Sequence, residues 1–229
     1  MIVAIDGPSG AGKSTLGKML AKELGLLYLD TGAMYRAVAL SALRSGISLD
    51  DKPNVANAAT NAEIELKGEP DLLKVFVNGD DVSDDIRTLD IAQAASVVST
   101  ISDVRRTMVE FQRKLGEQSE KGAVLEGRDI GSVVFPNADI KFFLTAKPEA
   151  RARRRFEEDK AKGRVSSYEQ TLAEINERDE RDVARVDSPL TIAEDAVVID
   201  TSELDLSEVF EQMLAKIRDL KVNAASKQR

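Results

Sequence analysis

A short stretch near the N-terminus, Gly7–Ser14, constrains this chain more than any other part of it. Its sequence, GPSGAGKS, fits the pattern G-x-x-x-x-G-K-[ST] without a mismatch. It follows an apolar run, Ile2–Ile5, that predicts a buried parallel strand. The apolar residues after it recur at helical spacing up to Gly25, the expected helix C-cap. Strand, glycine loop and helix together predict a phosphate-binding loop (P-loop).

The loop assigns chemistry to its own residues. Its backbone N–H groups are expected to converge on phosphate oxygens, and the helix dipole adds positive potential there. Lys13 would reach the β- and γ-phosphates, and the Ser14 hydroxyl would hold Mg²⁺. A glycine-rich turn without a ligand is the alternative, which this context disfavours. The residues assigned to a bound nucleoside triphosphate are Gly7, Pro8, Ser9, Gly10, Ala11, Gly12, Lys13, Ser14 and Thr15.

Composition excludes several other classes of protein. The 229 residues carry a net charge of −8, which argues against a nonspecific nucleic-acid binder. There is no cysteine, so we expect no disulfide and no cysteine metal site, as suits a reducing cytoplasm. There is also no histidine, the usual general base, and phosphoryl transfer tolerates that loss because it depends on positioning and charge neutralisation. No targeting segment and no membrane span is predicted.

Four further apolar runs resemble the strand before the P-loop. Helical patterns separate them, and this alternation predicts an α/β fold with a doubly wound parallel sheet. One such helix repeats from Val104 to Leu115, with Ser102 or Asp103 as its N-cap, and another repeats from Leu206 to Ile217. The four runs are Leu26–Leu29, Ala123–Leu125, Ile140–Leu144 and Ala196–Ile199.

The alternation breaks between about residues 61 and 82. Two short runs of strand character, Glu63–Leu66 and Lys74–Val77, flank a polar segment with Gly and Pro. Asn78-Gly79 follows and indicates a tight turn. This region is therefore predicted to be a small antiparallel sheet inserted between core elements.

Polar residues follow the second and third core strands. Thr31 and Arg36 come after the second and could hold a second anion, because ligands bind at the carboxyl ends of parallel strands. An N-cap with a surface arginine is the alternative there. After the third, Glu126 or Asp129 could order the waters of Mg²⁺, and Arg128 could grip a phosphate. A structural Arg–Asp pair in a turn is the alternative to that assignment.

Two arginine-bearing helical segments come later. A helix is predicted from about Tyr168, with Ser166–Glu169 or Ser167–Gln170 as capping box. Its inward stripe continues as Arg178, Asp182 and Arg185, which suggests that its far end lines a polar cavity rather than a solvated charged face.

The earlier segment carries Arg151, Arg153, Arg154 and Arg155. A mobile segment of this kind can close over phosphates and exclude water, which is a rival acceptor. A simple solvated basic face is the alternative.

Taken together, these residues resemble the bacterial cytidylate kinases, a family of P-loop nucleoside monophosphate kinases. The resemblance covers nearly the whole chain. The stretches that carry it are Gly7–Thr15, Asp30–Arg36, the antiparallel insert before Asp84–Arg87, Ala94–Ser96, Glu126–Gly131 and Glu177–Arg185.

The resemblance implies phosphorylation of CMP and dCMP by MgATP. It implies a core domain (1–35, 86–148 and 166–229), a monophosphate-binding region (36–85) and a helical, arginine-rich lid (149–165). Arg36, Arg128 and Arg185 would bind the acceptor phosphate, beside Thr31 and Tyr35. Ser96, Arg105 and Asp182 would read the cytosine edge, Asp129 would face the pentose, and Arg178 would lie between phosphates and sugar. The groups assigned to catalysis are Lys13, Arg128, Asp129, Arg151 and Arg155, with Ser14 and, through water, Glu126 at Mg²⁺.

Two positions depart mildly from the family pattern. Glu126 stands where relatives often carry Asp, and Thr31 where some have Ser. Another small-molecule kinase, acting on shikimate or dephospho-coenzyme A, is a rival reading, but such enzymes generally lack an insert of this size. A nucleotide-dependent switch is a second rival, and Thr145–Pro148 lacks the Asn and Asp of the guanine motif N-K-x-D. We expect a cytoplasmic monomer that binds neither nucleic acid nor membrane.

Overall fold

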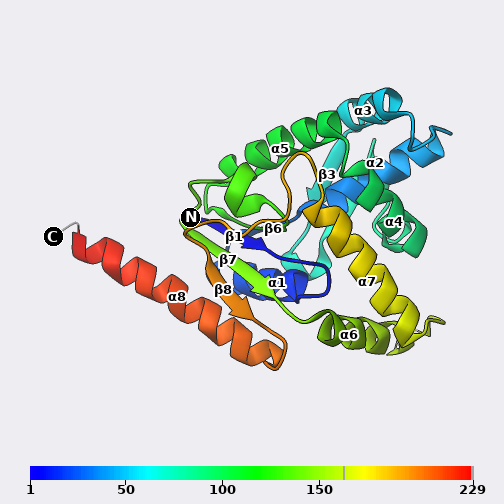
Figure 1. Cartoon of the computed structure of the whole chain (residues 1–229). Coiled ribbons are helices and arrows are strands. Elements are labelled where there is room, and N and C mark those ends of the chain that lie inside the picture. Colours follow the sequence, from blue (N-terminus) through cyan, green and yellow to red (C-terminus); the bar gives the residue numbers. More distant parts are fainter. Residues whose placement is uncertain (162, 228–229) are drawn as a thin grey trace.

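A five-stranded parallel sheet forms the centre of the computed structural model, which describes residues 1–161 and 163–227 (Figure 1). The strands lie in the order β2-β6-β1-β7-β8, and neighbours run parallel. Every strand predicted for the core is present, and each extends one or two residues further at its carboxyl end, where the apolar pattern gives way to polar residues. The strands are β1 (Ile2–Asp6), β2 (Leu27–Asp30), β6 (Ala123–Gly127), β7 (Ile140–Thr145) and β8 (Val197–Asp200).

Helices cover both faces of this sheet, which confirms the doubly wound architecture. Successive strand residues point to opposite faces, so β1 contributes to two separate cores. Val3 and Ile5 pack with apolar residues of α1 (Lys13–Leu24) and α8 (Leu206–Lys227). Ala4 belongs to the opposite core, against which α5 (Ser102–Glu117) and a π-helical turn, Ile130–Val134, pack.

A second layer of elements lies beyond β2. The predicted antiparallel insert is confirmed: β3 (Ile64–Lys67) pairs with β4 (Lys74–Val77), and β4 pairs with the short β5 (Asp80–Asp81) around the Asn78-Gly79 turn. Four helices pack with it in one core: α2 (Thr31–Arg44), α3 (Lys52–Asn61), α4 (Leu89–Val98) and the α5 face that carries Val104 and Met108. Short 3₁₀ turns occur at Pro70–Leu72 and Asp85–Arg87.

The arginine-bearing segment forms α6 (Pro148–Ala161), which packs beside α7 (Tyr168–Val183) (Figure 1). Ser167 and Gln170 form a capping box at the start of α7, which decides between the two boxes that the sequence allowed. Residue 162 of the expected lid and residues 228–229 of the expected core lie outside the described residues. Within the part of the chain that the structure describes, no helix has the length and apolar character needed to cross a membrane.

The predicted N-cap of α5 is wrong. The cap residue is Ile101, whose side chain makes no capping bond, so Ser102 and Asp103 both lie inside the first turn. Ile101 is buried in the core beside α4, and its carbonyl accepts the first helical bond from the Arg105 N–H at 3.0 Å. Burial of Ile101 therefore fixes where the helix begins, while Asp103 pairs with Arg106 at the surface.

Gly7, which joins β1 to the P-loop, packs closely against β7, and this packing can be tested by substitution. Its φ is 145°, and a Cβ there would lie 2.0 Å from the Leu144 carbonyl oxygen of β7. Gly7→Ala should lower the free energy of unfolding by more than about 3 kcal/mol, because rigid backbone faces the new methyl group. Gly25→Ala is the matched control: its φ is also positive, at 66°, but no atom lies within 4 Å, so about 1 kcal/mol is expected. Urea unfolding measures both, and equal losses would contradict this account.

Candidate active site

A cavity of about 680 Å³ opens at the carboxyl edge of the parallel sheet, as expected for this topology. Loops after β1, β2 and β6 line it, together with residues of α6 and α7. Among the described residues, eleven lysine and arginine side chains line the cavity against six aspartates and glutamates. The chain as a whole carries a net charge of −8, so positive charge is concentrated here. The cavity is therefore built for an anion.

The P-loop occupies one side of the cavity. Every residue from Ser9 to Thr15 lines the cavity, whereas Gly7 and Pro8 do not line it. Gly12 occupies the N-cap of α1 without a side-chain cap, so the end of the helix dipole faces the cavity. The Lys13 ammonium group donates to the Pro8 carbonyl oxygen at 2.7 Å. Burial, with Arg128 as a neighbouring cation, lowers the pKa of Lys13 to about 7.

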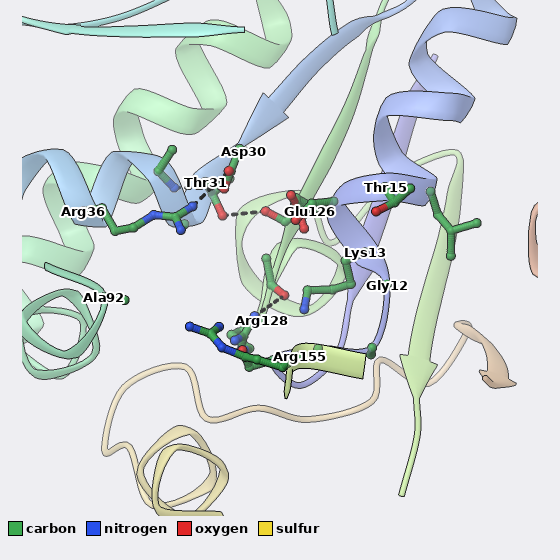
Figure 2. Close-up of a pocket in the computed structure, with 18 of the residues that line it drawn as sticks. Gly12, Lys13, Thr15, Asp30, Thr31, Arg36, Ala92, Glu126, Arg128 and Arg155 are labelled. Carbon is green, nitrogen blue, oxygen red and sulfur yellow. Dashed lines mark hydrogen bonds and ion pairs between the residues drawn. The ribbon is translucent and has the colours of Figure 1, made fainter. Parts of the chain in front are cut away.

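The end of β2 faces the P-loop across the cavity (Figure 2). Asp30 caps α2 by accepting from the Ala33 N–H at 2.9 Å, and Arg36 donates to the other Asp30 oxygen at 3.0 Å. Thr31 donates its hydroxyl to the Glu126 carbonyl at 2.6 Å, which joins β2 to β6. An N-cap and a cavity-lining arginine therefore occur together, although the sequence presented them as alternatives.

Asp182 on α7 organises the arginines on the far side of the cavity. Its carboxylate is 0% exposed; Arg128 donates to one oxygen at 2.7 Å and Arg185 to the other. Burial alone would raise the pKa of Asp182, but Arg128 and Arg185 hold it below its ordinary range. Arg185 also donates to the Ser99 hydroxyl at 2.9 Å. Arg178 and Arg185 line the cavity and Asp182 is buried behind them, but α7 ends at Val183, so Arg185 lies beyond the helix on which the spacing had placed it.

A second buried pair forms beside it. Arg105 donates to Asp129 and, at 3.1 Å, to the Ser99 carbonyl, and its guanidinium group lies 5.7 Å from the centre of the Tyr35 ring. Asp129 opens the π-helical turn, whose first two N–H groups, those of Ile130 and Gly131, donate to Asp6 at 2.8 and 2.7 Å. Asp6 therefore ties the loop after β6 to the strand that ends in the P-loop.

Several cationic groups near the cavity keep unused donors. Arg178 lines the cavity without a hydrogen bond or ion pair to any described residue. Burial, with Arg128 nearby, lowers its pKa to about 9. Within residues 1–161 and 163–227, the buried Nε atoms without a hydrogen-bond partner are those of Arg36, Arg105, Arg178 and Arg185. Because buried donors are normally satisfied, these atoms indicate an absent anionic or polar ligand.

The oxygen donors next to the P-loop fit a hard cation. Ser14 and Glu126 both line the cavity, and hydroxyl and carboxylate oxygens are ligands that Mg²⁺ accepts directly or through water. Burial raises the pKa of Glu126, Asp30 adds to that rise, and Lys13 opposes it. No group of three acidic side chains forms a metal cage anywhere in the described part of the chain. Mg²⁺ commonly relies on substrate phosphates for the rest of its ligands, so this donor set suits it.

Two residues assigned to the site, Ser96 and Arg151, do not line the main cavity, whereas a third, Arg155, lines it and the adjoining one. Ser96 lines an adjoining cavity of about 560 Å³ and its buried hydroxyl has no partner within the described chain. Arg151 does not line the main cavity: it donates to the Ala146 and Ser9 carbonyls at 2.9 and 3.1 Å and to both oxygens of Asp179. Arg155 lines both cavities and lies 3.9 Å from Asp159 (Figure 2).

Several residues that shape the site were not predicted from the sequence. Asp6 directly precedes the glycine loop at the carboxyl end of β1, and its place there was a usable signal. Ser99 gave no signal, because it acts from the end of α4 on a distant arginine. Leu204, Leu206 and Val209 add an apolar patch to the cavity, but their spacing indicated only a helix.

The fold and the cavity define the class of protein as a P-loop kinase. A gluconokinase from Sinorhizobium meliloti 1021 has a similar fold, with a TM-score of 0.50 over 99% of this chain and 97% of that one, at 15% identity. A family model described as cytidylate kinase matches residues 3–219, and the chain belongs to this family.

Two relatives illustrate the match. A cytidylate kinase of Caldanaerobacter subterraneus subsp. tengcongensis is 52% identical over 216 residues, which cover 94% of each chain. A cytidylate kinase of Geobacter sp. (strain M21) is 48% identical over 219 residues, or 96% of this chain and 93% of that one. The family resemblance read from the sequence is confirmed.

Asp6 gives the site a pH dependence that can be measured. Burial raises the pKa of Asp6 from 3.8 to about 6, against the Gly131 and Ile130 N–H groups, which favour its ionised form. The folded state thus binds this proton more tightly than the unfolded state, so the carboxyl group stabilises the fold most at low pH. The unfolding free energy of the wild type relative to Asp6→Asn should fall by about 2.4 kcal/mol from pH 4 to 7. A difference that grows with pH would mean that the two N–H donors outweigh burial.

Proposed function

We propose that this protein transfers the γ-phosphoryl group of MgATP to CMP or dCMP, giving CDP or dCDP and ADP. Membership of the cytidylate kinase family supports the proposal. The observation that carries it is the pair of anion-binding sets in one cavity. One set is the P-loop with Lys13, and the other is the arginine group around Asp182. A donor tail and an acceptor phosphate can thus meet in one enclosed space.

The donor side depends on the P-loop. Its amides and the N-terminus of α1 face the triphosphate, and Lys13 exchanges its Pro8 carbonyl partner for phosphate oxygens. Mg²⁺, held near Ser14 and Glu126, supplies charge neutralisation between the phosphates when it is bound. The apolar patch of Leu204, Leu206 and Val209 lies in the same cavity and suits the flat face of the adenine ring.

The acceptor side depends on the arginines. Arg36, Arg128 and Arg185 bind the CMP phosphate, Arg178 lies between the two nucleotides, and Arg155 approaches from α6. An oxygen of the CMP phosphate forms the new bond to the γ-phosphorus, while the bond to the β–γ bridging oxygen breaks. The attacking oxygen is already anionic near neutral pH, so the reaction needs no strong general base. A chain without histidine can therefore catalyse it.

Buried polar groups near the arginines would select the nucleobase of the acceptor. We assign the cytosine edge to Ser96, Arg105 and Asp182, and the pentose to Asp129. The Ser96 hydroxyl and the Arg105 Nε atom have no partner among the described residues, so each can bind the nucleotide without breaking an existing bond. Asp182 already carries two arginines, which fixes its orientation for a third contact.

The proposal also divides the chain. Segments 1–35, 86–148 and 166–229 form the core, 36–85 bind the monophosphate, and 149–165 form the lid. Within the lid, Arg151 is bound to Ser9 and Asp179, so we assign it to holding α6 against the P-loop, with Arg155 reaching the phosphates. Monomeric state and cytoplasmic location stay predictions.

Lys13 tests the donor assignment. Lys13→Ala should lower kcat about 100- to 1,000-fold, because a preorganised charge is lost where negative charge develops. Lys22→Ala is the matched control on the same helix: Lys22 is 70% exposed and pairs with Asp71 at the surface, so its kcat should stay near the wild-type value. A coupled ADP-release assay measures both, and near-normal turnover of Lys13→Ala would contradict the mechanism.

A substrate panel tests the acceptor assignment. The kcat/KM for CMP should exceed that for AMP by about 100-fold or more, because the wrong base leaves buried polar groups unpaired. Ser96→Ala should narrow this ratio and leave the KM for ATP unchanged. Steady-state kinetics with CMP, dCMP, UMP and AMP provide the measurement. Equal kcat/KM for CMP and AMP would reject the substrate and leave the kinase assignment intact.

A further inference from the structure

Tyr28 is a buried tyrosine in the middle of β2, and its ring is held on two sides. The residue is 2% exposed. Its ring edge faces Gly17 of α1, where a Cβ would lie 3.0 Å from Tyr28 Cε2, and the Lys18 ammonium group lies 5.9 Å from the ring centre. A ring packed in this way has little freedom to turn, so its hydroxyl group has a fixed position.

That hydroxyl group donates to Glu126 Oε1 at 2.5 Å. The strand register explains the contact: Tyr28 lies opposite Val124, and Asp30 opposite Glu126, so Tyr28 and Glu126 point to the same face two residues apart. Ser14, which lines the cavity together with Glu126, lies close to both groups. A phenol, a carboxylate and a P-loop hydroxyl therefore meet where we place Mg²⁺.

The side chain of Glu126 is one methylene longer than that of an aspartate, and the extra methylene adds a rotatable bond. A free glutamate would sample several orientations around the cation, and the hydrogen bond from Tyr28 restricts it to one. Because only one carboxylate oxygen accepts from Tyr28, the other stays available to the waters of a cation.

We propose that Tyr28 is a positioning residue for the Mg²⁺ site: it fixes the Glu126 carboxylate, and so compensates for the length of the glutamate side chain. The proposal rests on the function proposed above. Tyr28 does not line the main cavity, so it would act on the site through Glu126. Partners that orient a metal-binding carboxylate typically change metal affinity 10- to 100-fold.

The test uses Mn²⁺ as the probe, with a non-hydrolysable ATP analogue bound, and follows free Mn²⁺ by electron paramagnetic resonance. Tyr28→Phe removes one oxygen and keeps the packed ring. It should weaken Mn²⁺ binding about 10-fold and raise the Mg²⁺ concentration needed for half-maximal rate, with the KM for CMP unchanged. Tyr168→Phe, at the partly buried start of α7, is the control and should leave Mn²⁺ affinity unchanged. Unchanged Mn²⁺ affinity in Tyr28→Phe would overturn the proposal.

A second background separates positioning from packing. In Glu126→Asp the shorter carboxylate withdraws from Tyr28, so adding Tyr28→Phe to this variant should change Mn²⁺ affinity less than about twofold. Equal losses in both backgrounds would assign Tyr28 a packing role only. If the wild type with the analogue bound holds Mn²⁺ no better than Glu126→Ala, the metal site of the proposed function fails, a result distinct from failure of the Tyr28 contact.

Discussion

The active site depends on one carboxylate, Asp182, that is fully buried between Arg128 and Arg185. Burial of charge is costly, and a buried pair is stable only when its geometry and hydrogen bonds are good. Here a single negative group orients two positive ones and cannot neutralise both, and Arg178 beside them forms no ion pair with any described residue. We propose that this surplus positive charge gives the site its affinity for phosphate.

The parallel sheet makes this possible because it brings distant segments to one edge. The P-loop follows β1, Thr31 follows β2 and Arg128 follows β6, although more than 100 residues separate the first from the last. Specific bonds then lock these ends together: Thr31 binds the Glu126 carbonyl, and Asp6 binds the two N–H groups of the π-helical turn. These bonds hold the strand ends in fixed positions relative to one another, and Asp6 takes part in that link although it does not line the cavity.

Much of this organisation could be predicted from the sequence, and the exceptions have physical reasons. Parallel strands are long apolar runs, and helices repeat at 3.6 residues, so the sheet, the insert and the stripe from Arg178 to Arg185 were all predictable. The hydrogen-bond partners of individual side chains were not predictable in this way. Arg151 has the spacing of a lid arginine, yet its donors bind Ser9 and Asp179, because only the packed structure brings α6 and α7 together. In the sequence, Tyr28 looks like an ordinary strand residue, because its contact with Glu126 depends on the register between β2 and β6.

We propose that the arginine side chains lining the cavity are preorganised for phosphate. A crystal structure with CMP and a non-hydrolysable ATP analogue tests it most directly. We expect guanidinium nitrogens of Arg36, Arg128, Arg178 and Arg185 within hydrogen-bonding distance of nucleotide phosphate oxygens, with Asp182 still bound to two of them. Phosphates that lie outside this cavity, with the arginines directed away from them, would contradict the account.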